Sequence, residues 1–272
     1  ITKLLIYLLG SIIIISILIG RSPWMMLSGV GAMTAVLLLI FKDTILSFIA
    51  SLQINSNDLM KIGDWLEVPA FGADGDVIDI ALHTVKIQNW DKTITTIPTY
   101  KLLDSSFKNW RGMSESGGRR IKRAVNIDMT SVRLCDQNML EKFAKFQLIS
   151  SYIQERKKEV EEYNQKNSID TNQLINGRRL TNLGTFRKYI EEYLKNHPNI
   201  HQNMTFLVRQ LAPSHQGLPI EIYVFTNDIR WVNYEAIQAD IFDHILAVVP
   251  EFDLRVYQDP TGSDFGNLVR SK

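Results

Sequence analysis

Two uncharged apolar runs at the start of the chain constrain its fold most, because a chain that contains them must shield them from water. Residues 4–20 and residues 24–41 contain no Asp, Glu, Lys, Arg or His. A helix of 17 residues, the length of the first run, reaches about 25 Å, close to a hydrocarbon core of ~30 Å. A secretory signal peptide is the competing interpretation, but no small-residue cleavage site follows, and a second apolar run does. We therefore predict a transmembrane helix over residues 1–20. Because the chain begins at Ile1 rather than Met, we also expect residues before it.

A second membrane helix is predicted to begin after the break at Gly20-Arg21-Ser22-Pro23, with Ser22 as its N-cap and Pro23 in its first turn. Its first half is rich in small residues, namely Ser28, Gly29, Gly31, Ala32, Thr34 and Ala35. Small residues let membrane helices approach one another closely. A single hydrophobic anchor weakened by glycine is the simpler interpretation; we favour a helix that packs against copies of itself.

The end of the second run indicates a polar boundary. Lys42 and Asp43 follow it directly, and a charge at the bilayer centre costs about 2.5–3.5 kcal/mol. Beyond them, Ile45, Phe48, Ile49 and Leu52 recur at helical spacing. Residues 21–52 are therefore predicted to hold a self-packing membrane helix and then a short amphipathic helix. This second helix would lie along the interface or against a soluble layer, and need not continue in the same direction.

Net charge and cysteine count limit the classes of partner and the compartment that the chain can have. The net charge of +1 argues against a nucleic-acid partner, which usually requires a broad basic face. A single cysteine, Cys135, rules out an internal disulfide framework and fits a reduced compartment such as the cytosolic side of a membrane.

Residues 53–110 are predicted to form an all-β domain, a small Sm/SH3-like barrel or a sandwich, because alternating apolar residues recur between close turn signals. The predicted strands are 64–68, 77–80, 84–87 and 93–97, with turns at 72–75 and 89–92.

Residues 111–260 are predicted to form an α+β domain of ferredoxin-like order. The expected elements are a strand at 125–129, a helix at 139–146, a helix at 186–194, strands at 204–211 and 220–226, a helix at 237–248 and a last strand at 252–256. A solvated helical hairpin is expected as an insertion near 148–180, and residues 261–272 form a tail.

No constellation in the sequence predicts catalysis, a cofactor or a metal site. The five histidines are scattered. His197 and His201 are four residues apart, but Pro198 breaks the helix that would bring them together. One basic cluster, Arg119–Arg123, is interpreted first as a solvated strand edge or a positive-inside signal. Attraction of ions or lipids is the second interpretation.

Several motifs together resemble the MscS-type mechanosensitive channels, and among them the bacterial miniconductance subgroup. They are Gly29-Val30-Gly31-Ala32-Met33 leading into Phe41-Lys42-Asp43, then residues 61–68, 75–80 and 91–99. Each motif is weak alone; in this order the motifs are specific, and the resemblance runs from about residue 20 to residue 257.

The resemblance implies a homoheptamer in which each subunit contributes its last membrane helix to a central pore, above a cytoplasmic cage. Aligning Lys42 with the family's polar pore-mouth position places the apolar constriction at Ala35 and Leu39. A leucine ring can exclude water and ions by dewetting. Because Ala35 is smaller than the bulky residue expected, Leu38 or Phe41 could instead form the narrowest point. The pore mouth and a helix bend are expected at Phe41, Lys42 and Asp43, although the family's glycine is missing there.

The resemblance further implies a channel opened by membrane tension that protects a bacterium on hypo-osmotic shock. The expected location is the inner (plasma) membrane, with several passes and with the residues after about 43 in the cytoplasm. The expected partners are copies of the chain, membrane lipids, and permeating ions and small solutes. The alternative is a membrane-anchored oligomeric scaffold or regulator that does not conduct. A transporter would require intramembrane charges or broken helices in paired repeats, and the sequence has neither.

Overall fold

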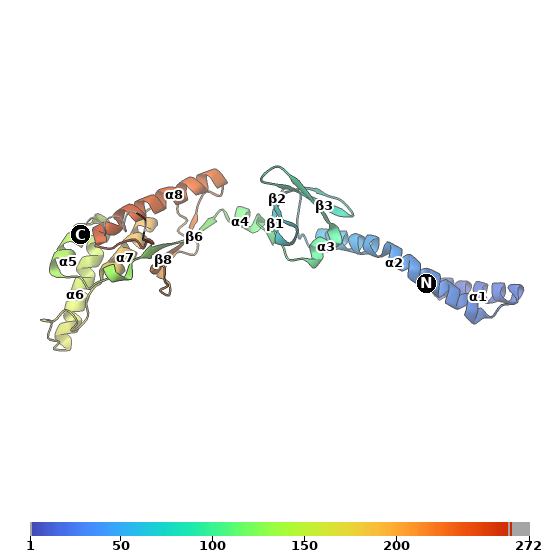
Figure 1. Cartoon of the computed structure of the whole chain (residues 1–272), viewed down its shortest axis with the longest axis horizontal. Coiled ribbons are helices and arrows are strands. Elements are labelled where there is room, and N and C mark those ends of the chain that lie inside the picture. Colours follow the sequence, from blue (N-terminus) through green and yellow to red (C-terminus); the bar gives the residue numbers. More distant parts are fainter. Residues whose placement is uncertain (1, 261, 263–272) are drawn as a thin grey trace. The chain divides into compact units, whose positions relative to one another are not determined.

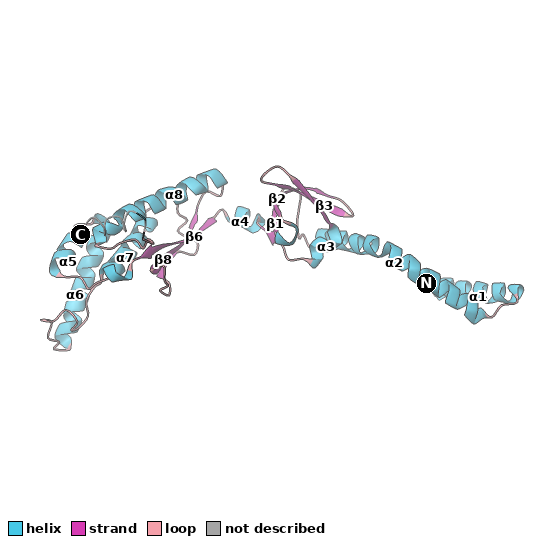
Figure 2. Ribbon diagram, viewed as in Figure 1, coloured by secondary structure: helices cyan, strands magenta, loops and turns pink. Residues whose placement is uncertain are grey.

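The computed structural model describes residues 2–260 and 262, so the predicted tail at 261–272 lies, except for residue 262, outside the described residues. The chain divides into two compact units, Ile1–Gly112 and Met113–Lys272. The first holds two long helices and a β-domain, and the second is an α/β-domain (Figures 1 and 2). Each unit is described by itself.

The first unit begins with two apolar helices, α1 (Thr2–Ile19) and α2 (Pro23–Ser56). Gly20 ends α1 in a left-handed conformation (φ 67°), which glycine adopts without steric cost. Ser22 occupies the N-cap of α2 and Pro23 its first turn, as predicted, although the Ser22 side chain makes no capping hydrogen bond. Within the described residues, α2 is the one helix long and apolar enough to cross a bilayer, and residues 9–19 of α1 form a shorter apolar helix.

The prediction of two separate helices within 21–52 is wrong. Helix α2 runs through Lys42 and Asp43 without a break, and residues 45–52 are its continuation. The physical reason is that neither glycine nor proline stands there, so nothing interrupts the backbone hydrogen bonds. The change in sequence pattern marks a change of surroundings instead, because Ser47, Ala50 and Ile54 are buried within the unit.

The β-domain is a five-stranded antiparallel sheet in the order β4-β3-β2-β1-β5. Its strands are β1 (Trp65–Val68), β2 (Ala73–Ile80), β3 (Thr84–Asn89), β4 (Ile94–Pro98) and β5 (Lys108–Asn109). The order is linear, with β4 and β5 at the edges, so the paired strands described here do not close into the predicted barrel. The core contains Ile54 from α2 together with apolar residues of the strands, including Leu66, Val68, Val85 and Ile97.

Four of these strands match the sequence prediction, and three other elements were missed. The short strand β5 and the six-residue helices α3 (Thr99–Asp104) and α4 (Arg111–Ser116) are too brief to show a periodic pattern. The turn predicted at 72–75 lies earlier, as a 3₁₀ turn (η1, Pro69–Phe71) that ends at Gly72 with φ 60°. Residues 73–75 already belong to β2.

The second unit contains a three-stranded antiparallel sheet in the order β6-β8-β7. Its strands are β6 (Arg119–Ile127), β7 (Leu207–Gln210) and β8 (Leu218–Thr226). Its helices are α5 (Gln137–Phe143), α6 (Ser150–Lys166), α7 (Asn182–Lys195) and α8 (Trp231–Val248). Short 3₁₀ turns lie at η2 (Met129–Ser131), η3 (Gln147–Ile149) and η4 (Val249–Phe252).

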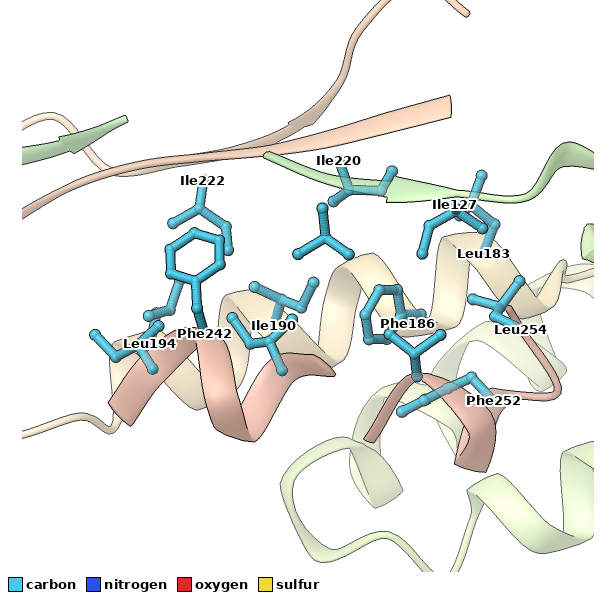
Figure 3. Packing of buried hydrophobic residues seen from close by; sticks show 14 of the residues in the cluster. Ile127, Leu183, Phe186, Ile190, Leu194, Ile220, Ile222, Phe242, Phe252 and Leu254 are labelled. Atoms are coloured by element: carbon cyan, nitrogen blue, oxygen red, sulfur yellow. The ribbon is translucent and has the colours of Figure 1, made fainter. Parts of the chain in front are cut away.

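The core of the second unit lies between the sheet and its helices. Figure 3 shows Phe186, Ile190 and Leu194 of α7 beneath strand residues Ile220 and Ile222. The 3.6-residue spacing that predicted this helix is therefore the spacing of its core-facing side chains.

The last predicted strand, at 252–256, does not form. Pro250 and Phe252 lie in η4, and Asp253 adopts a left-handed conformation with φ 53°, which ends any extended run. One antiparallel bridge remains, between Ile127 and Val256, and it is supported by a 2.8 Å hydrogen bond from the Tyr257 N–H to the Asn126 carbonyl. In a ferredoxin-like fold a fourth strand would cover this edge of β6. Here the single bridge pairs with it in place of a strand.

Two further predictions in this unit are wrong. Met129 lies in η2 rather than at the end of a strand, because the Asp128 carboxylate accepts the Thr130 N–H at 2.9 Å and starts a turn. The insertion near 148–180 is not a helical hairpin: α6 ends at Lys166, and 167–180 carry no second helix. Ser168 and Gly177 have positive φ there, which is incompatible with a continued helix.

Strands β2 and β3 approach each other closely at Gly75. A Cβ atom at this position would lie 1.9 Å from the Gln88 carbonyl oxygen of β3. We predict that Gly75→Ala destabilises the β-domain by about 3 kcal/mol, since backbone rather than a flexible side chain must move. Thermal unfolding followed by tryptophan fluorescence measures this, because Trp65 and Trp90 lie on or beside the strands.

The matched control is Gly112→Ala, since a Cβ atom at Gly112 would meet nothing within 4 Å. Equal unfolding temperatures for the two variants would contradict the packing at Gly75.

Candidate pore helix and its junction with the β-domain

All predicted pore residues lie on α2, and every one of them is exposed in the single chain. The predicted constriction residues Leu38 and Leu39 are 57% and 73% exposed, and Phe41 is 52% exposed. The others are also exposed, namely Ser28, Gly29, Gly31, Ala32, Ala35, Lys42 and Asp43. This part of α2 is therefore an apolar helix that the described residues of the chain leave uncovered.

Helix geometry separates the predicted residues into faces. At ~3.6 residues per turn, Ala32, Ala35 and Leu39 fall on one face of α2, together with Ser28 and Lys42. Gly29 and Gly31 flank this face on its two sides. Phe41 lies roughly 160° away from Leu39, on the opposite side of the helix. If Leu39 faces a pore, Phe41 therefore does not.

Nothing in the described chain requires glycine on the flanks of this face. A Cβ atom at Gly29 or at Gly31 would meet nothing within 4 Å. The hydroxyls nearby are satisfied within the helix: Ser28 Oγ donates to the Met25 carbonyl at 3.0 Å, and Thr34 Oγ1 donates to the Val30 carbonyl at 2.8 Å. The small residues thus leave a smooth surface without free hydroxyl donors, which is the kind of surface on which membrane helices pack.

The C-terminal turns of α2 are fixed to the β-domain. Ile54 is 2% exposed and belongs to the β-domain core, and Ala50 is 4% exposed. Ser51 Oγ also donates to the Leu82 carbonyl at 3.0 Å, across the loop between β2 and β3. Helix α3 packs against this part of α2 as well. One rigid element therefore links the exposed apolar stretch to the β-domain.

A groove of about 540 Å³ runs along this junction. Its lining comes from two helices: Lys42, Asp43, Leu46, Ile49, Ala50 and Gln53 of α2, and Tyr100, Leu103 and Asp104 of α3. It begins at the predicted pore-mouth residues. The sequence did not indicate it, because α3 was not predicted.

An ion-pair network closes the first unit just before its boundary at Gly112. Asp64, whose side chain is 9% exposed, accepts hydrogen bonds from Arg111 Nε at 2.9 Å and from Asn109 Nδ2 at 2.9 Å. Arg111 also reaches Asp58 in the loop after α2, at 3.1 Å. The network joins the end of α2 to the segment that leads out of the β-domain.

The same contacts set the protonation of Asp64. Burial by itself raises the pKa of a carboxyl group, but hydrogen bonds from Arg111, Asn109 and the Lys61 backbone outweigh it and hold the pKa of Asp64 below its ordinary value. Asp64 is therefore ionised at neutral pH. No pattern in the sequence reveals this pair, since its members are 47 positions apart.

The other candidate groups lie in the second unit. The basic cluster Arg119–Arg123 is on β6, where Arg119 stacks over Tyr234 at 4.5 Å and Arg123 over Phe242 at 4.4 Å. His197 packs edge-on against Tyr193 at 5.7 Å. Within residues 2–260, no group of three or more His, Cys, Asp or Glu side chains could hold a metal ion.

Two family models match the chain in the order in which its domains occur. Residues 43–112 match the β-domain of mechanosensitive ion channels, and residues 180–256 match the C-terminal domain of the mechanosensitive channel MscS. Together the two matches cover more than half of the 272 residues. The chain belongs to the MscS-type family of mechanosensitive channels. This is a family of ion channels and not of enzymes.

Curated relatives of the MscS type include the small-conductance mechanosensitive channel MscMJ of Methanocaldococcus jannaschii. It is 35% identical over 109 residues, which are 40% of this chain and 30% of the relative. The low conductance mechanosensitive channel YnaI of Escherichia coli is 24% identical over 210 residues, 76% of this chain and 46% of the relative. The chain thus spans less than half the length of these relatives.

Solved structures of MscS-type proteins share the fold. The closed-state crystal structure of Helicobacter pylori MscS aligns with a TM-score of 0.57 at 14% identity, over 96% of this chain and 80% of that one. The cryo-EM structure of Arabidopsis thaliana MSL1 aligns with a TM-score of 0.59 at 11% identity, over 90% of this chain and 69% of that one. The family match begins at Asp43, so the residues of the predicted constriction precede it and stay predictions. The resemblance to the miniconductance subgroup stays a prediction as well.

We predict that Arg111→Met destabilises the first unit by about 3 kcal/mol, because it leaves the carboxylate of Asp64 buried without its cation. Lys61→Met is the matched control: Lys61 binds Asp58 at 2.9 Å but is 64% exposed, so its loss should cost less than about 1 kcal/mol. Urea unfolding followed by tryptophan fluorescence compares the two. Equal losses would contradict the larger contribution of the buried Arg111–Asp64 pair.

We further predict that the effect of Asp64→Asn depends on pH. Because the folded-state pKa of Asp64 lies below 3.8, its contribution to the free energy of unfolding is fully present above that pH and is lost as the pH falls through the folded-state pKa. The stability difference between wild type and Asp64→Asn should therefore be largest near neutral pH and shrink as the pH is lowered below about 4. Unfolding curves over this range measure it, and a constant difference would contradict the ion-pair account.

Proposed function

We propose that the chain forms the pore and the cytoplasmic part of a tension-gated ion channel in a bacterial inner membrane. The observation that carries this proposal is the nature of α2: its apolar stretch is left uncovered by the rest of the described chain, and its C-terminal turns are buried in a soluble β-domain. The N-terminal part of such a helix requires lipid and neighbouring helices around it. Its C-terminal part requires a domain that is surrounded by water. The family to which the chain belongs provides the activity.

The uncovered face of α2 fits copies of the same helix better than it fits lipid. Gly29 and Gly31 flank the face that carries Ala35 and Leu39, so in a ring each helix would offer a small-residue flank to both neighbours. We propose a homoheptamer, as the family resemblance implies. The groove between α2 and α3 lies at the start of the soluble part, where neighbouring subunits in a ring would come together.

In this assembly Leu39 forms the main constriction and Ala35 a second, smaller ring on the same face. Lys42 and Asp43 then stand at the cytoplasmic mouth, and ions and small solutes pass between them. Leu38 lies roughly 100° from Leu39 on α2, which assigns it to a side of the ring rather than to its centre. Phe41 is assigned to the outer side for the same reason.

Tension opens the pore only if the open state occupies more membrane area than the closed state, because a force shifts an equilibrium only between states that respond to it differently. Outward tilting of α2 would widen the Leu39 ring and expand the protein in the bilayer. Since α2 continues as one helix into the β-domain core, such a tilt would also be transmitted to that domain.

The proposed topology has several passes, with α1 and α2 in the membrane and the residues after about 43 in the cytoplasm. Membrane lipids would surround the assembly, and opening it would release ions and solutes on hypo-osmotic shock. No cofactor and no nucleic acid take part in this mechanism.

A non-conducting scaffold is the competing function, and current recorded from the purified protein in liposomes separates the two. Single-channel openings that appear with suction support the channel. Their absence from patches that contain the protein would favour the scaffold.

We predict that Leu39→Ser lowers the tension needed for opening, because a ring of hydroxyls hydrates a constriction that leucines keep dry. Leu37→Ser is the matched control, since it makes the same substitution at a 47% exposed residue on roughly the opposite side of the helix. Patch recordings in liposomes measure both thresholds. An unchanged threshold for Leu39→Ser with a lowered one for Leu37→Ser would reverse the assignment of the pore face.

A further inference from the structure

A small cavity in the second unit is lined by four arginines. It has a volume of about 150 Å³ and lies between α6 and the beginning of α7. Arg156 comes from α6, Arg178 and Arg179 from the segment before α7, and Arg187 from α7 itself. No Asp or Glu is among the residues that line it. Four arginine side chains around so small a volume concentrate positive charge, which an anion would offset.

The described part of the chain neutralises this charge only in part. One carboxylate outside the lining, Glu159, serves both Arg156 and Arg178, and Arg178 Nη1 lies 3.1 Å from it. Arg179 donates to a neutral group, the Thr171 carbonyl, at 2.6 Å, and its Nε is buried with no hydrogen-bond partner among the described residues. Arg187 makes no ion pair or hydrogen bond with the described residues. An acceptor placed in the cavity would serve both groups.

Side chains rather than the helix end would make the contacts. The first-turn N–H groups of α7 are already used, because the Gly184 N–H donates to Thr181 Oγ1 at 3.0 Å and the Thr185 N–H to the Thr181 carbonyl at 3.0 Å. The positive end of the α7 dipole adds to the field of the arginines without offering a free donor.

We infer that this cavity binds a phosphate group, either free or carried by a lipid headgroup or a small phosphate ester. Guanidinium groups bind phosphate oxygens through paired, charge-assisted hydrogen bonds. The cavity, at about 150 Å³, has room for one phosphate group. The site does not depend on conduction. Five of its ten lining residues lie outside the residues that the two family models match, since α6 and Arg178–Arg179 precede residue 180.

The test is calorimetric titration of the purified full chain with inorganic phosphate, with chloride adjusted to keep the ionic strength constant. We expect saturable binding that weakens about tenfold or more in Arg179→Gln and in Arg187→Gln, because each loses a charged hydrogen bond. Lys158→Gln is the matched control, because it removes one positive charge from α6 at a residue outside the cavity. This variant should bind phosphate with the affinity of wild type. Arg187→Lys, which keeps the charge but loses the paired geometry, should lie between.

A second arm titrates dioctanoyl phosphatidic acid in place of inorganic phosphate. Binding of this lipid alone, weakened in the same two variants, would assign the site to a headgroup. Absence of saturable binding of either probe to wild type would overturn the inference, as would equal affinities in all variants. Unfolding temperatures without ligand, equal to that of wild type, establish that the variants are folded.

Discussion

The structure depends on one helix, α2, whose two halves require different surroundings. Helix α2 is apolar and uncovered over its first half, and its last turns enter the core of a soluble β-domain. A hydrocarbon environment stabilises the first half, because an α-helix satisfies its backbone hydrogen bonds within itself. Burial of Ala50 and Ile54 stabilises the other half. Since no break separates the two, neither part can change its orientation without affecting the other.

The β-domain is well suited to receive such a helix. Its strands close tightly where β2 meets β3 at Gly75, and the Asp64–Arg111 pair ties the loop after α2 to the segment that leaves the domain. Both features restrict motion within the first unit. We therefore expect a displacement of α2 to move the β-domain as a body rather than to deform it.

Periodic patterns in the sequence predicted much of this fold. The apolar runs marked α1 and α2, and alternation marked β1 to β4 and β8. The stripe containing Phe186, Ile190 and Leu194 marked α7, because it is the side of that helix that faces the sheet. The choice of Ala35, Leu39 and Lys42 also places three residues on one face of α2, as a pore lining requires.

The rest depends on contacts between distant residues or on short local effects. Asp64 and Arg111 pair across 47 positions, and the four arginines of the α6–α7 cavity lie on three separate segments, so neither site has a sequence pattern. The change of polarity at Lys42 predicts the end of a helix, but neither glycine nor proline stands there and α2 continues. At 252–256, by contrast, apolar alternation predicts a strand that does not form. Pro250 and the left-handed Asp253 produce a 3₁₀ turn there instead.

The central claim is that the uncovered face of α2 packs against copies of itself, and disulfide cross-linking tests it most directly. The protein carrying Gly29→Cys and Gly31→Cys together places one thiol on each flank of the predicted pore face. The native thiol does not interfere, because Cys135 is buried and burial raises its pKa to about 11. The account predicts that mild oxidation in membranes gives a ladder of covalent multimers that ends at the heptamer, whereas each single variant stops at dimers. Monomers alone after oxidation of the double variant would contradict it.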